Sequence, residues 1–253
     1  MSAAGAAWGT FASEAVSVVL SLFYLHRKLS PLALSGKDFI PGSPWMRSIL
    51  TIGIPISCQD GLIQVSFLAI TAIANSRGVE AAAAVGIVEK IISFLFLVPS
   101  AMMSTVSATT AQNLGAGLPE RGRKALRYGI TVCVSFGLLC ILLVHFKASE
   151  IVALFVPGEE AVIAMGNDYF QSYVLDCAIA GIHFCFSGCF AAHRKASFSF
   201  LHNVISIFTV RIPGTYAAAL LFPTTLYPMG MAAPAGSLLS VFICVFLYKK
   251  YLK

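Results

Sequence analysis

The chain has 253 residues, of which 58% are hydrophobic and 11% are charged, and its formal net charge is +6. This composition excludes an ordinary soluble domain, in which the charged fraction is about twice as high. The positive charge sits in short loops between apolar stretches, so membrane topology explains it better than nucleic-acid binding does. All seven cysteines lie in apolar stretches and are interpreted as buried hydrophobes rather than as a disulfide framework.

Seven apolar stretches are long enough to cross a bilayer, since a hydrocarbon core of about 30 Å needs about 20 residues of helix. Lipid tolerates only helices or closed barrels, and these stretches are too long and too evenly apolar for barrel strands. We therefore expect an all-α integral membrane protein with seven transmembrane helices. In chain order, the predicted spans cover approximately residues 3–25, 48–75, 80–111, 125–146, 164–192, 198–221 and 229–248.

The stretch between the first and second spans is rich in Pro, Gly and Ser, which is typical of a linker. We therefore expect one helix in residues 1–28, a cytoplasmic linker at 29–44 and a six-helix unit at 45–253. Four spans also contain a proline, which lacks a backbone N–H and can kink a helix. These prolines are Pro55, Pro99, Pro213 and Pro234.

The basic residues cluster at alternate ends of the spans, which predicts the topology because cytoplasmic loops carry excess Lys and Arg. The clusters place the C-terminus in the cytoplasm and the N-terminus outside, in a multi-pass protein of the cell membrane. The members of the clusters are Arg27, Lys28, Lys37, Arg47, Arg121, Arg123, Lys124, Arg127, Arg194, Lys195, Lys249, Lys250 and Lys253.

Several charged and amide side chains lie inside the apolar spans, where a charge costs about 2.5–3.5 kcal/mol at mid-bilayer. At about 1.5 Å of rise per residue, the charged ones lie about 14–20 Å deep on four helices, close to the midplane. Glu14 of the first span lies at a similar depth. Such a layer predicts a central cavity that binds ions or a polar substrate. The candidate binding residues are Gln59, Asp60, Gln64, Glu89, Lys90, Asp176 and Arg211.

Two interpretations of these groups stay open. Glu89 or Asp60 could pair with Lys90 or Arg211 and neutralise a buried charge. Alternatively, Asp60 and Gln64, which share a helix face at i and i+4, could supply oxygen ligands to a small cation or a protonatable carboxylate.

Metal, cofactor and catalytic sites are not expected. His183, Cys185 and Cys189 resemble metal ligands in residue type, but the surroundings are apolar and no second cluster supports them. The sequence contains no nucleotide-binding loop and no hydrolase or metalloprotease motif, which argues against an enzyme and against an ATP-driven pump. Coupling to a gradient of Na⁺ or H⁺ remains as the driving force for uphill transport.

One stretch carries a recognisable motif, VGIVEKIISFLFLVPSAMMSTVSATTAQNLGAGLPERGRKALR at residues 85–127. It strongly resembles the multidrug and toxic compound extrusion (MATE) family, in which a span with an acid–base pair ends in a Gln-Asn-Gly-rich turn followed by basic residues. IGIPISCQDGLIQVSF at 52–67 and VRIPGTY at 210–216 resemble the family too. The turn residues can adopt positive φ and end a helix, so we interpret the segment as a structural hinge and topological anchor. Besides Glu89 and Lys90, the motif consists of Gln112, Asn113, Gly115, Gly117 and Arg121.

The resemblance implies two six-helix lobes around a central cavity that opens alternately to each side. It implies that this chain holds the last helix of the first lobe, the interlobe linker and the second lobe. The implied activity is cation-coupled antiport of small organic molecules, cationic or amphipathic, together with a missing N-terminal lobe or a second copy. Three features depart from the family, and the chief one is that most of the first lobe is absent. The family's acids near Ile63 and Gly188 are displaced here to Asp60 and Asp176, and AAHRKAS at 191–197 replaces a glycine-rich turn.

Other functions fit the same sequence. A related fold could act as a flippase for lipid-linked precursors or polysaccharides. The chain could also be a non-transporting membrane fragment or a helper subunit. A seven-span receptor fits less well, because the short loops offer no external ligand domain.

Overall fold

The computed structural model describes residues 3–28 and 44–252, and every regular element in these ranges is a helix. The chain divides into two compact units, Met1–Arg47 and Ser48–Lys253. All seven predicted spans are confirmed as helical segments long and apolar enough to cross a membrane. Apart from Pro44, the predicted linker lies outside the described residues.

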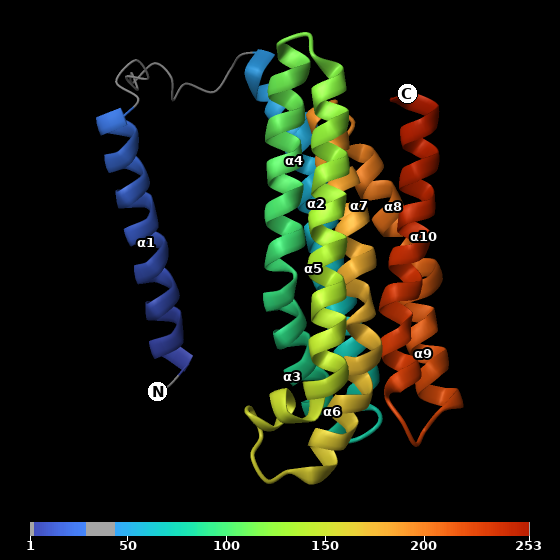
Figure 1. Cartoon of the computed structure of the whole chain (residues 1–253). Coiled ribbons are helices and arrows are strands. Elements are labelled where there is room, and N and C mark those ends of the chain that lie inside the picture. The colour runs from blue at the N-terminus through green and yellow to red at the C-terminus, as the bar shows by residue number, and fades with distance from the viewer. Residues whose placement is uncertain (1–2, 29–43, 253) are drawn as a thin grey trace. The chain divides into compact units, whose positions relative to one another are not determined.

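The first unit contains α1, Ala3–Lys28, which corresponds to the first predicted span. The remaining spans follow from α2 onward (Figure 1). Their bounds are α2 Pro44–Asn75, α3 Val79–Leu95, α4 Leu97–Gly115, α5 Pro119–Ala153, α6 Glu160–Tyr173, α7 Leu175–Ala192, α8 Ser197–Ser206, the π-helix η2 Ile207–Arg211, α9 Ile212–Leu221 and α10 Tyr227–Tyr251.

Within the second unit the spans run up and down, so their basic ends gather at one end. The turn between α4 and α5 and the C-terminus lie at that end in Figure 1, and the loops 154–159 and 222–226 lie at the other. Several helices extend beyond the predicted bounds. For example, α5 begins at Pro119 rather than near 125, because its first turns carry basic residues whose charged ends can reach the interface.

Three spans that the sequence predicts as continuous helices, at 80–111, 164–192 and 198–221, are interrupted in the structure. The first breaks at Phe96, between α3 and α4, and the second at Val174, between α6 and α7. The third contains η2, directly before α9. Pro99 and Pro213 explain two of these breaks, because each leaves the carbonyl four residues earlier without its helical hydrogen bond.

Helix α7 forms the centre of the unit, since it packs against α4, α5 and α10. Glycines permit this close packing. A Cβ at Gly188 would collide with the backbone oxygen of Met103 in α4, and one at Gly137 would collide with Ala178 in α7. Small residues at such contacts let membrane helices approach one another closely.

The turn between α4 and α5 is formed by part of the predicted hinge motif. Gly117 has φ of 73°, the amide of Leu118 donates to the carbonyl of Asn113 at 2.8 Å, and the amide of Gly117 donates to that of Leu114 at 3.1 Å. This is a Schellman turn. Gly115, expected to take part in the turn by positive φ, instead ends helix α4. Gln112 and Arg121 flank the turn and are exposed.

The turn after α7 has the same geometry without a glycine. The amide of Lys195 donates to the carbonyl of Phe190 at 2.8 Å, and the amide of Arg194 donates to that of Ala191 at 3.0 Å. Arg194 takes the left-handed position with φ of 57°. Although AAHRKAS departs from a glycine-rich sequence, it therefore preserves the glycine-type turn at a conformational cost to Arg194.

Arg194→Gly should stabilise the protein. A left-handed L-residue costs about 1–2 kcal/mol, whereas the extra freedom of an unfolded glycine costs about 0.5–1 kcal/mol. We expect a net gain of about 0.5–1 kcal/mol, measured as a higher Tm in detergent. Arg194→Ala is the matched control, because it removes the same exposed side chain and keeps the strained backbone. A glycine variant no more stable than the alanine variant would contradict this account.

Candidate functional site

A narrow cavity lies where the three helix discontinuities meet. Phe96 comes from the first break, Asp176 lies two residues after the second, and Ile207 and Arg211 belong to η2. The cavity has a volume of about 40 Å³. That is room for a few waters at most, since one water needs about 10–15 Å³ on this measure.

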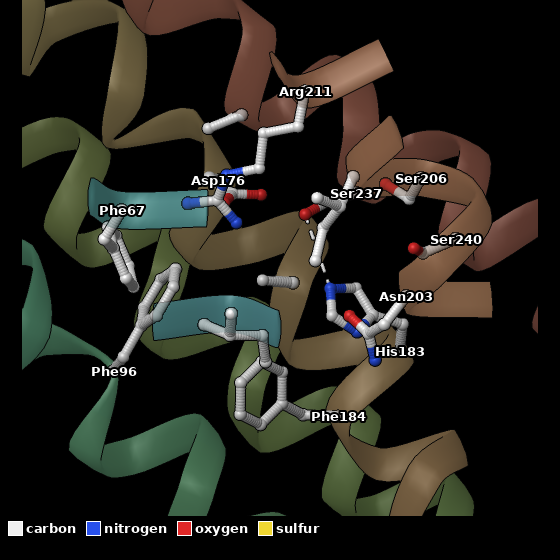
Figure 2. A pocket seen from close by; sticks show the side chains of 14 residues that line it. Phe67, Phe96, Asp176, His183, Phe184, Asn203, Ser206, Arg211, Ser237 and Ser240 are labelled. Atoms are coloured by element: carbon white, nitrogen blue, oxygen red, sulfur yellow. Dashed lines mark hydrogen bonds between the residues drawn. The ribbon is translucent and has the colours of Figure 1, made fainter. Parts of the chain in front are cut away.

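The cavity has an aromatic side and a polar side (Figure 2). Phe67 and Phe96 lie on one side, and Ser237 and His183 lie on the other. The guanidinium of Arg211 approaches the carboxylate of Asp176 between them. A few polar groups in a mostly apolar wall are typical of a small-ligand site.

Asp176 is 1% exposed, its carboxylate faces the hydroxyl of Ser237, and neither carboxylate oxygen forms a well-aligned hydrogen bond with the described residues. Arg211 does not form an ion pair with it within 4.0 Å. Instead, the guanidinium donates to the hydroxyl of Tyr173 and lies 5.0 Å from the ring centre of Phe67. A buried carboxylate without partners is costly. Asp176 is therefore a candidate binding residue, since a proton, a cation or water at its carboxylate would satisfy it.

A second, larger hollow lies between α2 and α3, with a volume of about 420 Å³, and we call it the groove. Gln64, Glu89 and Lys90 line it. Glu89 accepts a hydrogen bond from the hydroxyl of Thr71 at 3.3 Å, while its other oxygen is buried without a partner. Phe67 lines both the groove and the cavity, so the two spaces adjoin at this ring.

The seven sequence candidates thus fall into separate places. Asp176 and Arg211 share the cavity, and Gln64, Glu89 and Lys90 share the groove. The other two line neither space. Gln59 is buried with its side-chain oxygen unpartnered, and Asp60 is exposed one residue later on α2.

The first of the two open interpretations, in which Glu89 or Asp60 pairs with Lys90 or Arg211, finds no such ion pair in the described part of the chain. Ion pairs between described residues join Arg123 to Glu120 and Lys147 to Glu150, near the ends of α5. Glu89, Lys90 and Arg211 therefore form no ion pair with one another.

A buried polar network beside the cavity was missed by the sequence reasoning. A ring nitrogen of His183 lies 3.3 Å from the hydroxyl of Ser237, and one of His202 lies 3.1 Å from that of Ser187. The two imidazoles are edge to face with centroids 5.3 Å apart. A signal was present, because polar residues recur every three or four positions on three apolar helices. These residues are His183 and Ser187 on α7, Ser199, His202, Asn203 and Ser206 on α8, and Ser237 and Ser240 on α10.

Comparison with known proteins gives a consistent result. The family model MatE matches residues 55–217. The chain is 28% identical over 256 residues to the probable multidrug resistance protein YpnP of Bacillus subtilis (strain 168), covering 99% of this chain and 55% of YpnP. It is 26% identical over 239 residues to an FAD transporter of Shewanella oneidensis, covering 90% of this chain and 52% of that protein.

The fold is shared with solved structures. One is the crystal structure of a mutant of the Vibrio cholerae MATE transporter VcmN, with a TM-score of 0.87 and 18% identity, covering 98% of this chain and 56% of that one. The chain thus spans about half the length of the proteins it resembles. Its seven membrane-spanning segments correspond to one six-helix lobe and one helix of the other lobe.

Proposed function

Because this chain belongs to the MatE family, we propose that it acts as the C-terminal part of a cation-coupled exporter of small organic molecules. An inward gradient of Na⁺ or H⁺ would drive the export. The name of YpnP, a probable multidrug resistance protein, supports an organic substrate. The observation that carries the proposal is the unpartnered carboxylate of Asp176 at the meeting point of three interrupted helices.

Interrupted helices suit this function because transporters bind ions and substrates near the midplane at such breaks. Irregular backbone is tolerated at membrane depth where it lines a cavity. Arrival of a cation or proton at Asp176 would weaken its attraction to Arg211. Arg211 is the last residue of η2, so a change in its position would be passed to the α8–α9 span.

The groove is the proposed substrate surface. Its volume of about 420 Å³ lies within the range of drug-sized sites. Glu89 supplies a carboxylate for a cationic substrate, and Phe67 supplies an aromatic face for cation–π contact. Since Phe67 also lines the cavity of Asp176, substrate and coupling ion would act on opposite sides of one ring.

A second protein surface is the proposed partner, either an N-terminal lobe or a second copy of this chain. Asp60 and Gln64 are exposed in the middle of a membrane span. Contact with lipid at that depth would be unfavourable for both. A partner that covers this face of α2 would close the groove into a central cavity.

An anionic cargo is the alternative substrate. Lys90 faces the groove and forms no ion pair with the described residues, and one relative is named an FAD transporter. A phosphate-bearing molecule, such as a nucleotide or a lipid-linked precursor, would pair with this ammonium. A helper subunit that does not transport is the remaining alternative.

Asp176→Asn should reduce gradient-driven transport of ethidium into liposomes at least tenfold, because the amide cannot take up a proton or balance a cation. Asp168→Asn is the matched control. Asp168 lies in the same span but outside the cavity, and its hydrogen bond from Thr225 can be kept by the amide oxygen. Equal losses in both variants, or none in Asp176→Asn, would contradict the proposed role. Transport of FAD without ethidium would favour the anionic cargo.

The cell membrane is the proposed location, with the basic ends of the second unit in the cytoplasm. Green fluorescent protein fused after Lys253 should therefore fluoresce, whereas alkaline phosphatase fused there should be inactive. The same fusions at Pro223, in the loop after α9, should give the opposite result. An active phosphatase after Lys253 would reverse the orientation.

A further inference from the structure

The buried histidines extend the cavity toward the basic end of the unit. Asp176, His183 and Ser187 follow one another along α7. From Asp176 to Ser187 the helix rises by about 16 Å, and Ser187 lies about 8 Å from the end of α7. Polar side chains therefore recur along α7 from mid-membrane to within two turns of the basic turn at Arg194.

The hydrogen bonds of these polar side chains fix how the two imidazole rings are oriented. Nε2 of His183 faces the hydroxyl of Ser237, and Nε2 of His202 faces that of Ser187. The two Nδ1 atoms are buried and lack partners among the described residues. The two imidazoles lie edge to face with centroids 5.3 Å apart, and one water between the rings would satisfy both Nδ1 atoms.

We propose that Asp176, Ser237, His183, His202 and Ser187 form a proton path between the cavity and the cytoplasmic end of the unit. The path rests on the proposed function and selects the proton rather than Na⁺ as the coupling ion. Histidine suits such a path because its two ring nitrogens can accept and release a proton on opposite sides.

The transfer balances in each step. The carboxyl of Asp176 gives its proton, through cavity water, to the oxygen of Ser237, whose own proton passes to Nε2 of His183. A water between the rings takes the proton on Nδ1 of His183 and gives one of its own to Nδ1 of His202. The proton on Nε2 of His202 moves to the oxygen of Ser187, whose own proton passes to water that would reach Ser187 from the end of α7, about 8 Å away. Asp176 becomes a carboxylate, and each imidazole returns to neutral with its tautomer exchanged.

The surroundings of the path leave the proton few other destinations. Asp176 and Arg211 are the charged groups that line the cavity. No charged residue occurs in α4, in α5 between Arg127 and Lys147, or in α10 before Lys249. Other titratable groups beside the path are Tyr173, which accepts a hydrogen bond from Arg211, and Cys177, which follows Asp176 on α7. The thiols of Cys133 from α5 and Cys185 from α7 lie 3.8 Å apart.

Nuclear magnetic resonance tests the path without any transport assay. In the full chain, labelled with ¹⁵N-histidine and held in lipid nanodiscs, the rings should have opposite tautomers. His183 should carry its proton on Nδ1 and His202 on Nε2, or the reverse after one transfer. His183→Gln and His202→Gln assign the two signals. The same tautomer in both rings would overturn the path, because a water between them could not then take a proton from one ring and give one to the other.

Transport measurements test whether the path carries the coupling proton. His202→Gln keeps a hydrogen-bonding side chain but cannot relay a proton, so ethidium accumulation driven by a pH gradient should fall at least tenfold. Ethidium exchange without a gradient should stay within twofold of wild type. Ser199→Ala is the control: its hydroxyl lies on the same helix and donates only to the backbone of Ser187, so both rates should stay within twofold.

The outcomes separate the two proposals. Unchanged gradient-driven transport in His202→Gln, or equal losses in both assays, would overturn the path while leaving the exporter intact. Wild-type exchange that a pH gradient does not drive would overturn both proton coupling and the path. Opposite tautomers in a chain that moves no ethidium would support the path and reject the exporter as the function of this chain.

Discussion

The bilayer core offers no water to an unsatisfied backbone group, and this constraint organises the second unit. A helix can break at membrane depth only where the protein or a water-filled space satisfies the freed groups. The breaks at Phe96, Val174 and Ile207–Arg211 lie in three different spans, and residues at or beside each of them line one cavity. The unit therefore concentrates its irregular backbone at a single place.

The side chains at that place follow the same rule. Asp176 and Arg211 are costly in an apolar surrounding unless a partner, water or ligand satisfies them. Their failure to form a direct ion pair leaves both available to a third group. Close packing of α7 through glycines at Gly137, Gly181 and Gly188 holds the carboxylate on the central helix. Under the proposed function, the cavity would respond to a proton or an ion while the surrounding helices remain packed.

Hydropathy predicted the spans well, because the length of each apolar stretch decides whether it crosses the bilayer. The break at Phe96 has a signal in Pro99, but the break at Val174 has no proline within a turn after it. Depth along a helix could also be estimated from the sequence. The side of the helix on which a residue lies relative to the core could not be estimated from the sequence. For example, Gln59 is buried, whereas its neighbour Asp60 is exposed. Grouping side chains requires knowing which face each helix presents, and packing partners decide that.

A high-resolution structure of the protein in lipid, at a resolution that shows ordered water, tests the central claim most directly. This account expects density for water or a cation within hydrogen-bonding distance of the Asp176 carboxylate, with Arg211 separated from it. A dry contact in which the guanidinium of Arg211 is paired directly with that carboxylate, with the space around it filled by side chains, would contradict the account.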